Sequence, residues 1–182
     1  MSRAVLSAGS NVGDRAAHLR AVVDRFGDEV VAVSPIHVTA PWGGVEQDDF
    51  YNITLVVEAD RTPRDWLDIG RELEREAERT REIRWGPRTL DVDVISVDID
   101  QTTVVDDDPE LTLPHPRAAQ RAFVLIPWLA ADPDATLWTP DGVRSVSALL
   151  AALDEDERDG VTELGPTRSG VAADSSSDRD TP

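Results

Sequence analysis

Cysteine and lysine are both absent from the 182-residue chain, and each absence removes a class of chemistry. Without cysteine there are no disulfides, thiol nucleophiles or zinc–thiolate sites, so any metal must be held by oxygen or imidazole ligands. Without lysine there is no P-loop, whose signature requires that residue. The glycines never fall in a Gly-x-Gly-x-x-Gly pattern, which removes the usual dinucleotide fingerprint. If this chain binds phosphate, it must do so with arginine and metal.

Long apolar runs are also missing. The longest run, residues 123–131, is interrupted by Pro127 and is far shorter than the about 20 residues that span a bilayer. The first residues contain only the short apolar run Ala4-Val5-Leu6, so no signal peptide is predicted. We therefore expect a soluble, cytoplasmic protein, and the lack of cysteine fits a reducing compartment.

Positive charge is scarce. The formal net charge is -18, and all 18 basic residues are arginine. This charge disfavours nucleic acid and anionic membranes as partners, although it is equally compatible with a salty cytoplasm. We expect a monomer that acts on small molecules.

The chain length suits one domain, which we place at residues 1–165. Residues 166–182 are rich in Ser, Asp, Gly and Pro and nearly lack large apolar side chains, so burial cannot offset the entropy of ordering them. We predict a disordered tail there.

Apolar periodicity predicts the element order β-α-β-β-α-β over residues 4–97. The predicted strands are 4–8, a β-rich stretch 30–39, 50–59 and 90–97, and the predicted helices run from Asp14 to Gly27 and from Thr62 to about Arg79. Further along we expect a short strand at 104–105, a helix at 117–131, a strand at 136–138 and a helix at 145–153. The fold class is α+β: a ferredoxin-like βαββαβ core in αβα layers, with additional C-terminal helices and short strands.

Two carboxylates stand out on the strand predicted at 90–97. Asp91 and Asp93 alternate, so they share one face with their Cα atoms about 6.6 Å apart. Mg²⁺ prefers such hard oxygen ligands together with water and substrate phosphates, and two ions can clamp an in-line displacement. The alternative is a solvated strand face, which is the more common explanation of an isolated Asp-x-Asp.

Arginines precede this pair. Arg84 and Arg88 flank Gly86-Pro87, a bend that can direct both guanidinium groups at one phosphate. Arg79 and Arg81 add further cations after the long helix. Ordinary ion pairs with the glutamates of that helix are an equally good explanation of the last two.

The stretch 84–94, Arg-Trp-Gly-Pro-Arg-Thr-Leu-Asp-Val-Asp-Val, resembles the signature of the 6-hydroxymethyl-7,8-dihydropterin pyrophosphokinase family. Other stretches agree in the order of the family: Gly9-Ser10-Asn11, Thr39 with Pro41, Phe50-Tyr51-Asn52, and Leu113-Pro114-His115-Pro116 followed by Arg121 and Phe123. The resemblance covers about residues 3–155. It requires a one-residue gap between Ile83 and Arg84, which sets the register of Arg79 and Arg81.

The resemblance implies Mg²⁺-dependent transfer of pyrophosphate from ATP to the hydroxymethyl group of the pterin, releasing AMP, a step of folate biosynthesis. It implies two Mg²⁺ ions and ATP as co-substrate. The catalytic residues implied are Arg79, Arg81, Arg88, Asp91 and Asp93, with Asp91 and Asp93 as the metal ligands. The implied ATP-binding residues are Glu74, Arg84, Arg88, Val94, Thr112, His115 and Arg121. The implied pterin-binding residues are Thr39, Pro41, Trp42, Phe50, Asn52, Trp85 and Phe123.

Physical chemistry supports the pterin set, because a flat heterocycle packs well on Phe50 and Phe123 and an amide such as Asn52 both donates and accepts. Plain core packing is an equal alternative for the two phenylalanines, and a weaker one for Asn52, which β-strands disfavour. Pro116 is a departure: some relatives have tyrosine there, so a ring or hydroxyl contact from that position is lost.

Two other functions would explain part of the pattern. A different Asp-x-Asp enzyme, such as a nucleotidyl- or glycosyltransferase, uses the same metal chemistry but leaves Phe50-Tyr51-Asn52 and the Pro114-His115 stretch unexplained. A non-catalytic ferredoxin-like domain predicts weak magnesium binding and no pterin affinity. The acidic run 106–108 is interpreted as a solvated turn.

Overall fold

Strands and helices follow one another in the order that the sequence predicts for a ferredoxin-like core. A computed structural model describes residues 1–41, 47–77 and 89–165 of the chain. The elements are β1 (Ser2–Ser10), α1 (Arg15–Phe26), the 3₁₀ helix η1 (Gly27–Glu29), β2 (Val30–Val33), β3 (His37–Thr39), β4 (Phe50–Ala59), α2 (Pro63–Glu76), β5 (Asp91–Ile99), β6 (Thr102–Thr103), the 3₁₀ helix η2 (Ala118–Gln120), α3 (Ala122–Ala131), β7 (Thr136–Thr139), β8 (Gly142–Ser145), α4 (Val146–Ala151), α5 (Glu155–Asp159) and β9 (Val161–Glu163).

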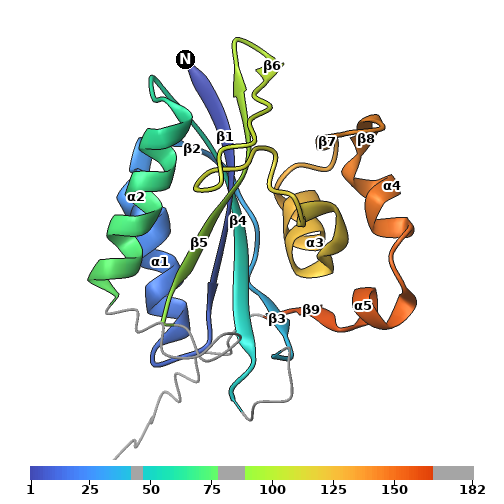
Figure 1. Cartoon of the computed structure of the whole chain (residues 1–182). Helices are drawn as coiled ribbons and strands as arrows, with labels where there is room; N and C mark the ends of the chain where they lie inside the picture. Colours follow the sequence, from blue (N-terminus) through green and yellow to red (C-terminus); the bar gives the residue numbers. More distant parts are fainter. Residues whose placement is uncertain (42–46, 78–88, 166–182) are drawn as a thin grey trace, which may run out of the picture.

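The main sheet is antiparallel, with strand order β6-β5-β1-β4-β3-β9, and β2 pairs with β4 beside β3. Helices α1 and α2 cover one face, and α3 covers the other with α4 packed against it (Figure 1). This arrangement confirms the α+β class, the split βαβ core and the αβα layers.

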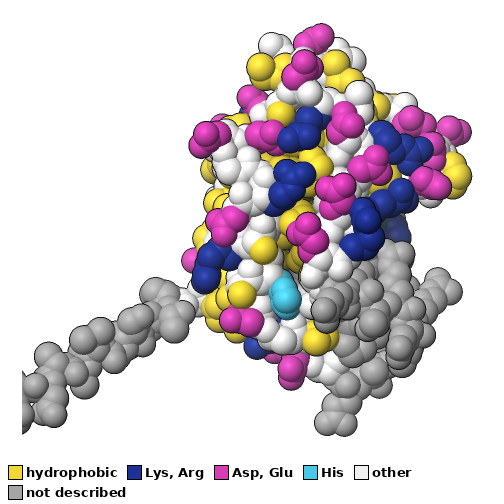
Figure 2. All heavy atoms as spheres, turned by 90° about the vertical axis from the view of Figure 1, so that its left-hand side faces the viewer, with side chains coloured by type: hydrophobic (Ala, Val, Ile, Leu, Met, Phe, Trp, Pro, Cys, Tyr) yellow, Lys and Arg dark blue, Asp and Glu magenta, His cyan; other side chains and the backbone are white. Residues whose placement is uncertain are grey.

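Alternating side chains of the central strands supply a separate core on each face. Leu6 and Leu55 belong to the core beneath α1 and α2, whereas Val5 and Val56 belong to the core beneath α3. Trp66 of α2 is completely buried in the first core, and its indole N–H donates to the Ser2 hydroxyl oxygen at 3.0 Å. On the outer surface of the α1–α2 layer, arginine and acidic side chains lie interspersed (Figure 2).

Capping residues begin and end the first two helices as the sequence predicts. The Asp14 carboxylate accepts the Ala17 N–H at 3.0 Å, and Gly27 follows α1 with φ of 49°. At the start of α2, Thr62 and Asp65 form a reciprocal capping box, with Pro63 in the first turn. The hydrogen bonds from Thr62 lower the pKa of the Asp65 carboxyl below its ordinary value. Helix α2 ends at Glu76, before the predicted end near Arg79, which lies outside the described residues.

The predicted strand at 104–105 is wrong. Strand β5 continues to Ile99, two residues beyond the predicted end, and a tight turn at Asp100 and Gln101 returns the chain so that Thr102 pairs with Ile99. Both turn residues have positive φ, 49° and 66°, as the favoured two-residue hairpin turns require. Asp100 and Gln101 do not form the Asn-Gly or Asp-Gly pair that is typical of such a turn, so the turn was not predicted.

Two predicted elements are each divided in the structure. The stretch 30–39 forms β2 and β3, separated at Ser34-Pro35-Ile36, and the Ser34 hydroxyl oxygen bridges the break by accepting the Thr54 N–H at 3.0 Å. The helix predicted at 117–131 forms η2 and α3, because Arg121 between them has an extended backbone with φ of −121° and ψ of 101°.

The C-terminal part contains more elements than predicted. Strand β7 and helix α4 match the predictions at 136–138 and 145–153 closely, but β8, α5 and β9 were not predicted. Strand β9 pairs with β3 and so ties residue 163 to the main sheet. The domain boundary at 165 stays a prediction, since residues 166–182 lie outside the described part. Within the ranges described, every helix is too short or too polar to cross a membrane.

Replacing Thr62 by alanine tests the capping box. Thr62→Ala removes the acceptor of the Asp65 N–H and should lower the free energy of unfolding by about 1 kcal/mol. Urea denaturation monitored by circular dichroism measures this change. Thr62→Ser keeps the hydroxyl and should stay close to wild type; equal losses in both variants would show that the cap does not stabilise α2.

Candidate active site

The two aspartates of the Asp-x-Asp pair begin strand β5 and face α3. Val92 and Val94, which alternate with them, are buried in the core beneath α1 and α2. Asp91 and Asp93 therefore project from the opposite face, and both are partly buried. The predicted common face is thus confirmed.

Strand pairing places residues from three strands in one row with Asp91. Gly9 of β1 pairs with Asp91 of β5 on one side and with Asn52 of β4 on the other, and Asn52 pairs in turn with His37 of β3. Directly opposite residues share a face, so the carboxylate and the amide lie on one surface with a glycine between them. A Cβ atom on Gly9 would lie 2.9 Å from Asn52 Oδ1, so only glycine leaves room for the amide.

A bulge in β5 brings His115 to this face. Val5 pairs with Ser96 and Leu6 with Val94, which leaves Ile95 as an extra residue in β5. The Ile95 carbonyl oxygen accepts the His115 N–H at 2.7 Å. The extra residue therefore anchors the His115 backbone to the strand two residues from Asp93.

Asp93 lies among cationic and imidazole side chains. Arg121 Nη1 is 3.4 Å from Asp93 Oδ2, and the Arg121 side chain is only 19% exposed. Burial lowers the pKa of Arg121, and the nearby Asp93 carboxylate opposes that change. Burial also lowers the pKa of His115, opposed by Asp93 and reinforced by Arg121 and Arg117. His115 is consequently neutral at pH 7.

The tautomer of that neutral ring follows from its contacts. The Arg117 backbone N–H donates to His115 Nδ1 at 3.1 Å, so the ring hydrogen resides on Nε2. A neutral Nε2–H donor beside an arginine suits a phosphate oxygen, since it adds a directed hydrogen bond without requiring a second buried charge.

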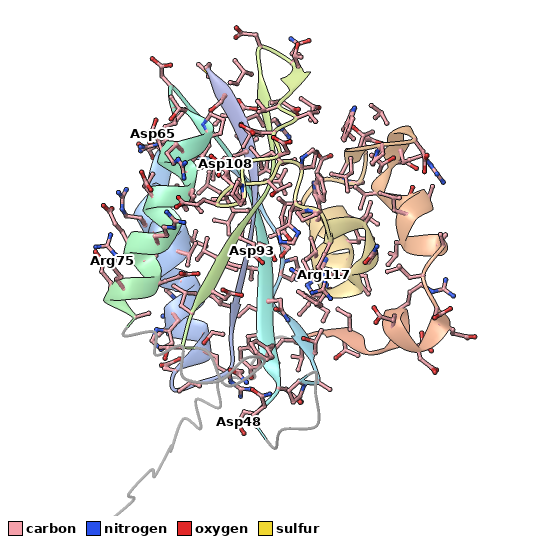
Figure 3. All side chains as sticks on the ribbon, in the orientation of Figure 1. Asp48, Asp65, Arg75, Asp93, Asp108 and Arg117 are labelled. Carbon is pink, nitrogen blue, oxygen red and sulfur yellow. The ribbon has the colours of Figure 1, made fainter. Side chains whose placement is uncertain are left out.

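Arg117 was not selected from the sequence, although the structure brings it to this group. Its charge acts on both His115 and Arg121, which places it near the two, and Figure 3 shows it at the α3 side of the sheet. Its position two residues after His115 was the available signal. Sequence periodicity alone assigned it to a helix end.

Four of the residues predicted to bind the pterin, Thr39, Phe50, Asn52 and Phe123, belong to β3, β4 and α3 on the same side of the sheet as Asp91. The Asn52 side-chain N–H₂ donates to Thr39 Oγ1 at 2.9 Å, and both side chains are buried. Phe50 lies at the start of β4, with its ring edge 3.8 Å from the position of a Cβ on Gly9. Phe123 enters from α3, and Arg121 lies over its ring with the guanidinium carbon 5.6 Å from the centroid. Arg121 therefore touches both the Asp93 carboxylate and Phe123.

Three predicted ATP residues lie nearby in different settings. Glu74 of α2 accepts the Val92 N–H at 3.0 Å, and Thr112 donates its hydroxyl to the Asp108 carbonyl oxygen at 3.0 Å. The Val94 side chain is buried on the other face of the sheet, so only its main chain is available to a nucleotide on the Asp93 side.

Pro41, predicted to touch the pterin, is partly buried just after β3. The remaining predicted site residues lie outside the described part of the chain: Trp42, Arg79, Arg81, Arg84, Trp85 and Arg88.

The donor set on β5 fits magnesium. Across the described ranges, no three His, Asp or Glu side chains come together as a preformed metal cage. Asp91 and Asp93 offer a pair of carboxylates on one face, and Mg²⁺ commonly takes one or two carboxylates and fills its other positions with water and phosphate oxygens. The site therefore suits a cation that arrives with a phosphate substrate.

Comparison with known proteins agrees with this geometry. The sequence model of the family 7,8-dihydro-6-hydroxymethylpterin-pyrophosphokinase (HPPK) matches residues 5–133. A Mycobacterium tuberculosis protein named 2-amino-4-hydroxy-6-hydroxymethyldihydropteridine pyrophosphokinase is 49% identical over 174 residues, covering 92% of each chain. The protein of the same name from Mycobacterium leprae is 49% identical over 168 residues, covering 88% of each.

Solved structures show the same fold. The crystal structure of Plasmodium falciparum HPPK-DHPS with pteroate superposes with a TM-score of 0.53 at 13% identity, over 82% of this chain. This chain spans only 42% of the length of that one. Sequence and fold together show that the chain belongs to the 7,8-dihydro-6-hydroxymethylpterin-pyrophosphokinase family.

Proposed function

We propose that this protein transfers pyrophosphate from ATP to the hydroxymethyl group of 6-hydroxymethyl-7,8-dihydropterin, giving AMP and the pterin pyrophosphate in folate biosynthesis. The observation that carries the proposal is the row Asp91, Gly9 and Asn52, which joins a phosphate-handling half and a heterocycle-binding half on one face of the sheet. A different Asp-x-Asp transferase would not require the Asn52 half.

The reaction exchanges one bond for another at the β-phosphorus. The pterin hydroxyl oxygen forms a bond to that phosphorus, the bond to the oxygen bridging the α- and β-phosphates breaks, AMP leaves with that oxygen, and the hydroxyl proton is released. Such transfers depend on positioning and on neutralising charge, and no covalent enzyme intermediate is needed. The arginine-rich surroundings of Asp93 suit this requirement.

On the ATP half, each group has a role that its chemistry favours. Arg121 and His115 donate to phosphate oxygens, and Arg117 adds a further positive charge beside them. Asp91 and Asp93 would hold Mg²⁺, which would supply positive charge to the phosphates. The roles predicted for Arg79, Arg81, Arg84 and Arg88 stay predictions from the resemblance, as do those of Glu74, Val94 and Thr112.

On the pterin half, the Asn52 amide hydrogen-bonds the edge of the heterocycle, and Phe50 and Phe123 pack on its faces. The hydrogen bond from Asn52 to Thr39 orients the amide, which leaves its carbonyl oxygen as an acceptor above Gly9. Pro41, Trp42 and Trp85 complete the predicted set.

Four other properties also stay predictions: the presence of two Mg²⁺ ions, the monomeric state, the cytoplasmic location and the lack of a nucleic-acid partner.

Identifying the nucleotide product tests the proposed function. The protein is incubated with Mg-ATP and 6-hydroxymethyl-7,8-dihydropterin, and the products are separated by anion-exchange chromatography. We expect AMP and pterin pyrophosphate in equal amounts. Formation of ADP, or no turnover, would contradict the proposal.

Changing Asp93 tests the metal half separately. Asp93→Asn removes a charged oxygen ligand and should lower kcat roughly 100-fold or more, since the phosphate charge is then poorly neutralised. Pterin affinity, measured by fluorescence titration, should change little. Asp98→Asn, near the other end of β5, is the matched control and should keep wild-type kcat; a comparable loss there would argue against a specific role for Asp93.

Adding a methyl group at Gly9 tests the pterin half. Gly9→Ala places a Cβ 2.9 Å from Asn52 Oδ1 and should displace the amide. We expect pterin Kd to rise about tenfold, the equivalent of about 1.4 kcal/mol. Calorimetric binding of a non-hydrolysable ATP analogue serves as the internal control and should be unchanged. Wild-type pterin affinity in a folded Gly9→Ala variant would refute the role given to Asn52.

A further inference from the structure

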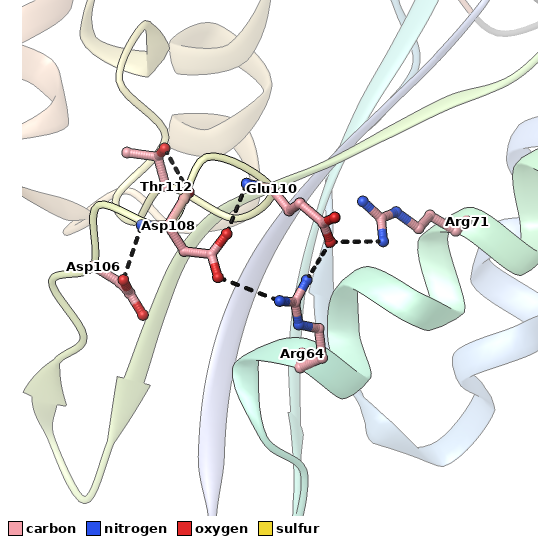
Figure 4. A network of polar contacts seen from close by, with 6 residues as sticks. All are labelled: Arg64, Arg71, Asp106, Asp108, Glu110 and Thr112. Atoms are coloured by element: carbon pink, nitrogen blue, oxygen red, sulfur yellow. Dashed lines mark hydrogen bonds and ion pairs between the residues drawn. The ribbon is translucent and has the colours of Figure 1, made fainter.

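A cluster of ion pairs joins the loop that carries His115 to helix α2, although the two segments lie far apart in the sequence (Figure 4). Arg64 contacts two acidic side chains of the loop, with Nη1 2.8 Å from Glu110 Oε2 and Nη2 3.3 Å from Asp108 Oδ2. Arg71, two helical turns further along α2, is 3.5 Å from the same Glu110 oxygen. We call Arg64, Arg71, Asp108 and Glu110 the α2–loop cluster.

The acidic part of this loop is a closed turn with little freedom of its own. Asp106 and Leu113 exchange two backbone hydrogen bonds of 2.9 Å. The Asp106 carboxylate accepts the Asp108 N–H at 3.0 Å, and Asp108 Oδ1 accepts the Glu110 N–H at 2.8 Å. Asp108 thus uses one carboxylate oxygen inside the turn and the other for Arg64. The residues predicted as a solvated turn do form a turn, and it is also bound to a helix.

This turn leads directly into the segment that reaches the active site. Leu113 is buried in the core beneath α1 and α2, and two residues later the His115 N–H bonds to the Ile95 carbonyl oxygen. Helix α2 also supports β5 itself, because the Glu74 carboxylate accepts the Val92 N–H at 3.0 Å. One helix therefore contacts both the strand that bears Asp91 and Asp93 and the loop that bears His115.

We propose that Arg64 and Arg71 are positioning residues for the nucleotide: through Asp108 and Glu110 they orient the loop so that His115 meets the ATP phosphates. This inference rests on the proposed function of the site. The side chains of the cluster are about half exposed, from 39% for Asp108 to 60% for Glu110. Exposed pairs of this kind add little to folding stability and are weakened by salt. The buried Leu113 keeps the loop folded, and the cluster sets its orientation.

Kinetics of glutamine variants test the proposal. Arg64→Gln and Glu110→Gln should each raise KM for ATP about two- to fivefold, in the range expected for one exposed ion pair. KM for the pterin and the Tm should stay at the wild-type values. The two substitutions should be less than additive in the double variant, because both remove the contact between Arg64 and Glu110. Raising the salt concentration should increase KM for ATP in the wild type and much less in Arg64→Gln.

The matched control breaks a different exposed ion pair of the same helix. The Arg25 guanidinium of α1 lies 3.7 Å from the Glu72 carboxylate of α2, with side chains 41% and 52% exposed, and this pair joins α2 to α1 instead of to the loop. Arg25→Gln should leave KM for ATP unchanged. An unchanged KM for ATP in Arg64→Gln, or an equal rise of KM for ATP and KM for the pterin, would overturn the positioning role. The proposed function would still stand if the wild type turned over both substrates.

Hydrogen exchange gives a readout that does not require turnover. Amides of residues 106–113 should exchange faster in Arg64→Gln than in the wild type and in Arg25→Gln. Equal exchange rates in all three proteins would show that α2 does not restrain the loop. This conclusion would hold even if the wild type produced no AMP and the proposed function had failed.

Discussion

The antiparallel pairing of β1 with β4 and β5 is the constraint on which the site depends. Because Gly9 pairs with Asp91 on one side and Asn52 on the other, residues separated by 39 positions in the sequence share one row of one face. A register slip of one residue in either pair would move a carboxylate or the amide to the opposite face, into the core beneath α1 and α2. The two cores enforce the register, since Leu6 and Val94 are buried on that side and Val5 and Ile95 on the other.

Electrostatics around Asp93 differ from those of the whole chain. The protein carries a net charge of -18, yet Arg121, Arg117 and His115 gather beside this carboxylate. The cations are arginines throughout, and the planar guanidinium group forms paired hydrogen bonds with phosphate where an ammonium group acts only as a point charge. Burial keeps His115 neutral, so the site combines permanent charge with a directed neutral donor. Because its arginines are concentrated at one location, an acidic protein can still attract a nucleoside triphosphate there.

Local signals in the sequence predicted much of the fold. Asp14, Gly27 and the Thr62-Pro63 start identified both ends of α1 and the start of α2 because capping is a short-range interaction, and the β-rich run at 50–59 matched the bounds of β4. The common face of Asp91 and Asp93 followed from strand geometry alone. Features that depend on partners distant in sequence were not accessible: the extra residue at Ile95, the extended backbone of Arg121 that divides the predicted helix, and the pairing of β9 with β3. Arg117 and the α2–loop cluster were not predicted for the same reason, because their roles depend on contacts that only the folded structure shows.

We expect one face of β5, β1 and β4 to bind both substrates side by side. A crystal structure of the protein with Mg²⁺, a non-hydrolysable ATP analogue and 6-hydroxymethyl-7,8-dihydropterin would locate both. Metal density is expected on the Asp91 and Asp93 carboxylates, with the pterin hydrogen-bonded to Asn52 and packed against Phe50 and Phe123. Metal bound elsewhere, or a pterin bound away from the row that Gly9 organises, would contradict it.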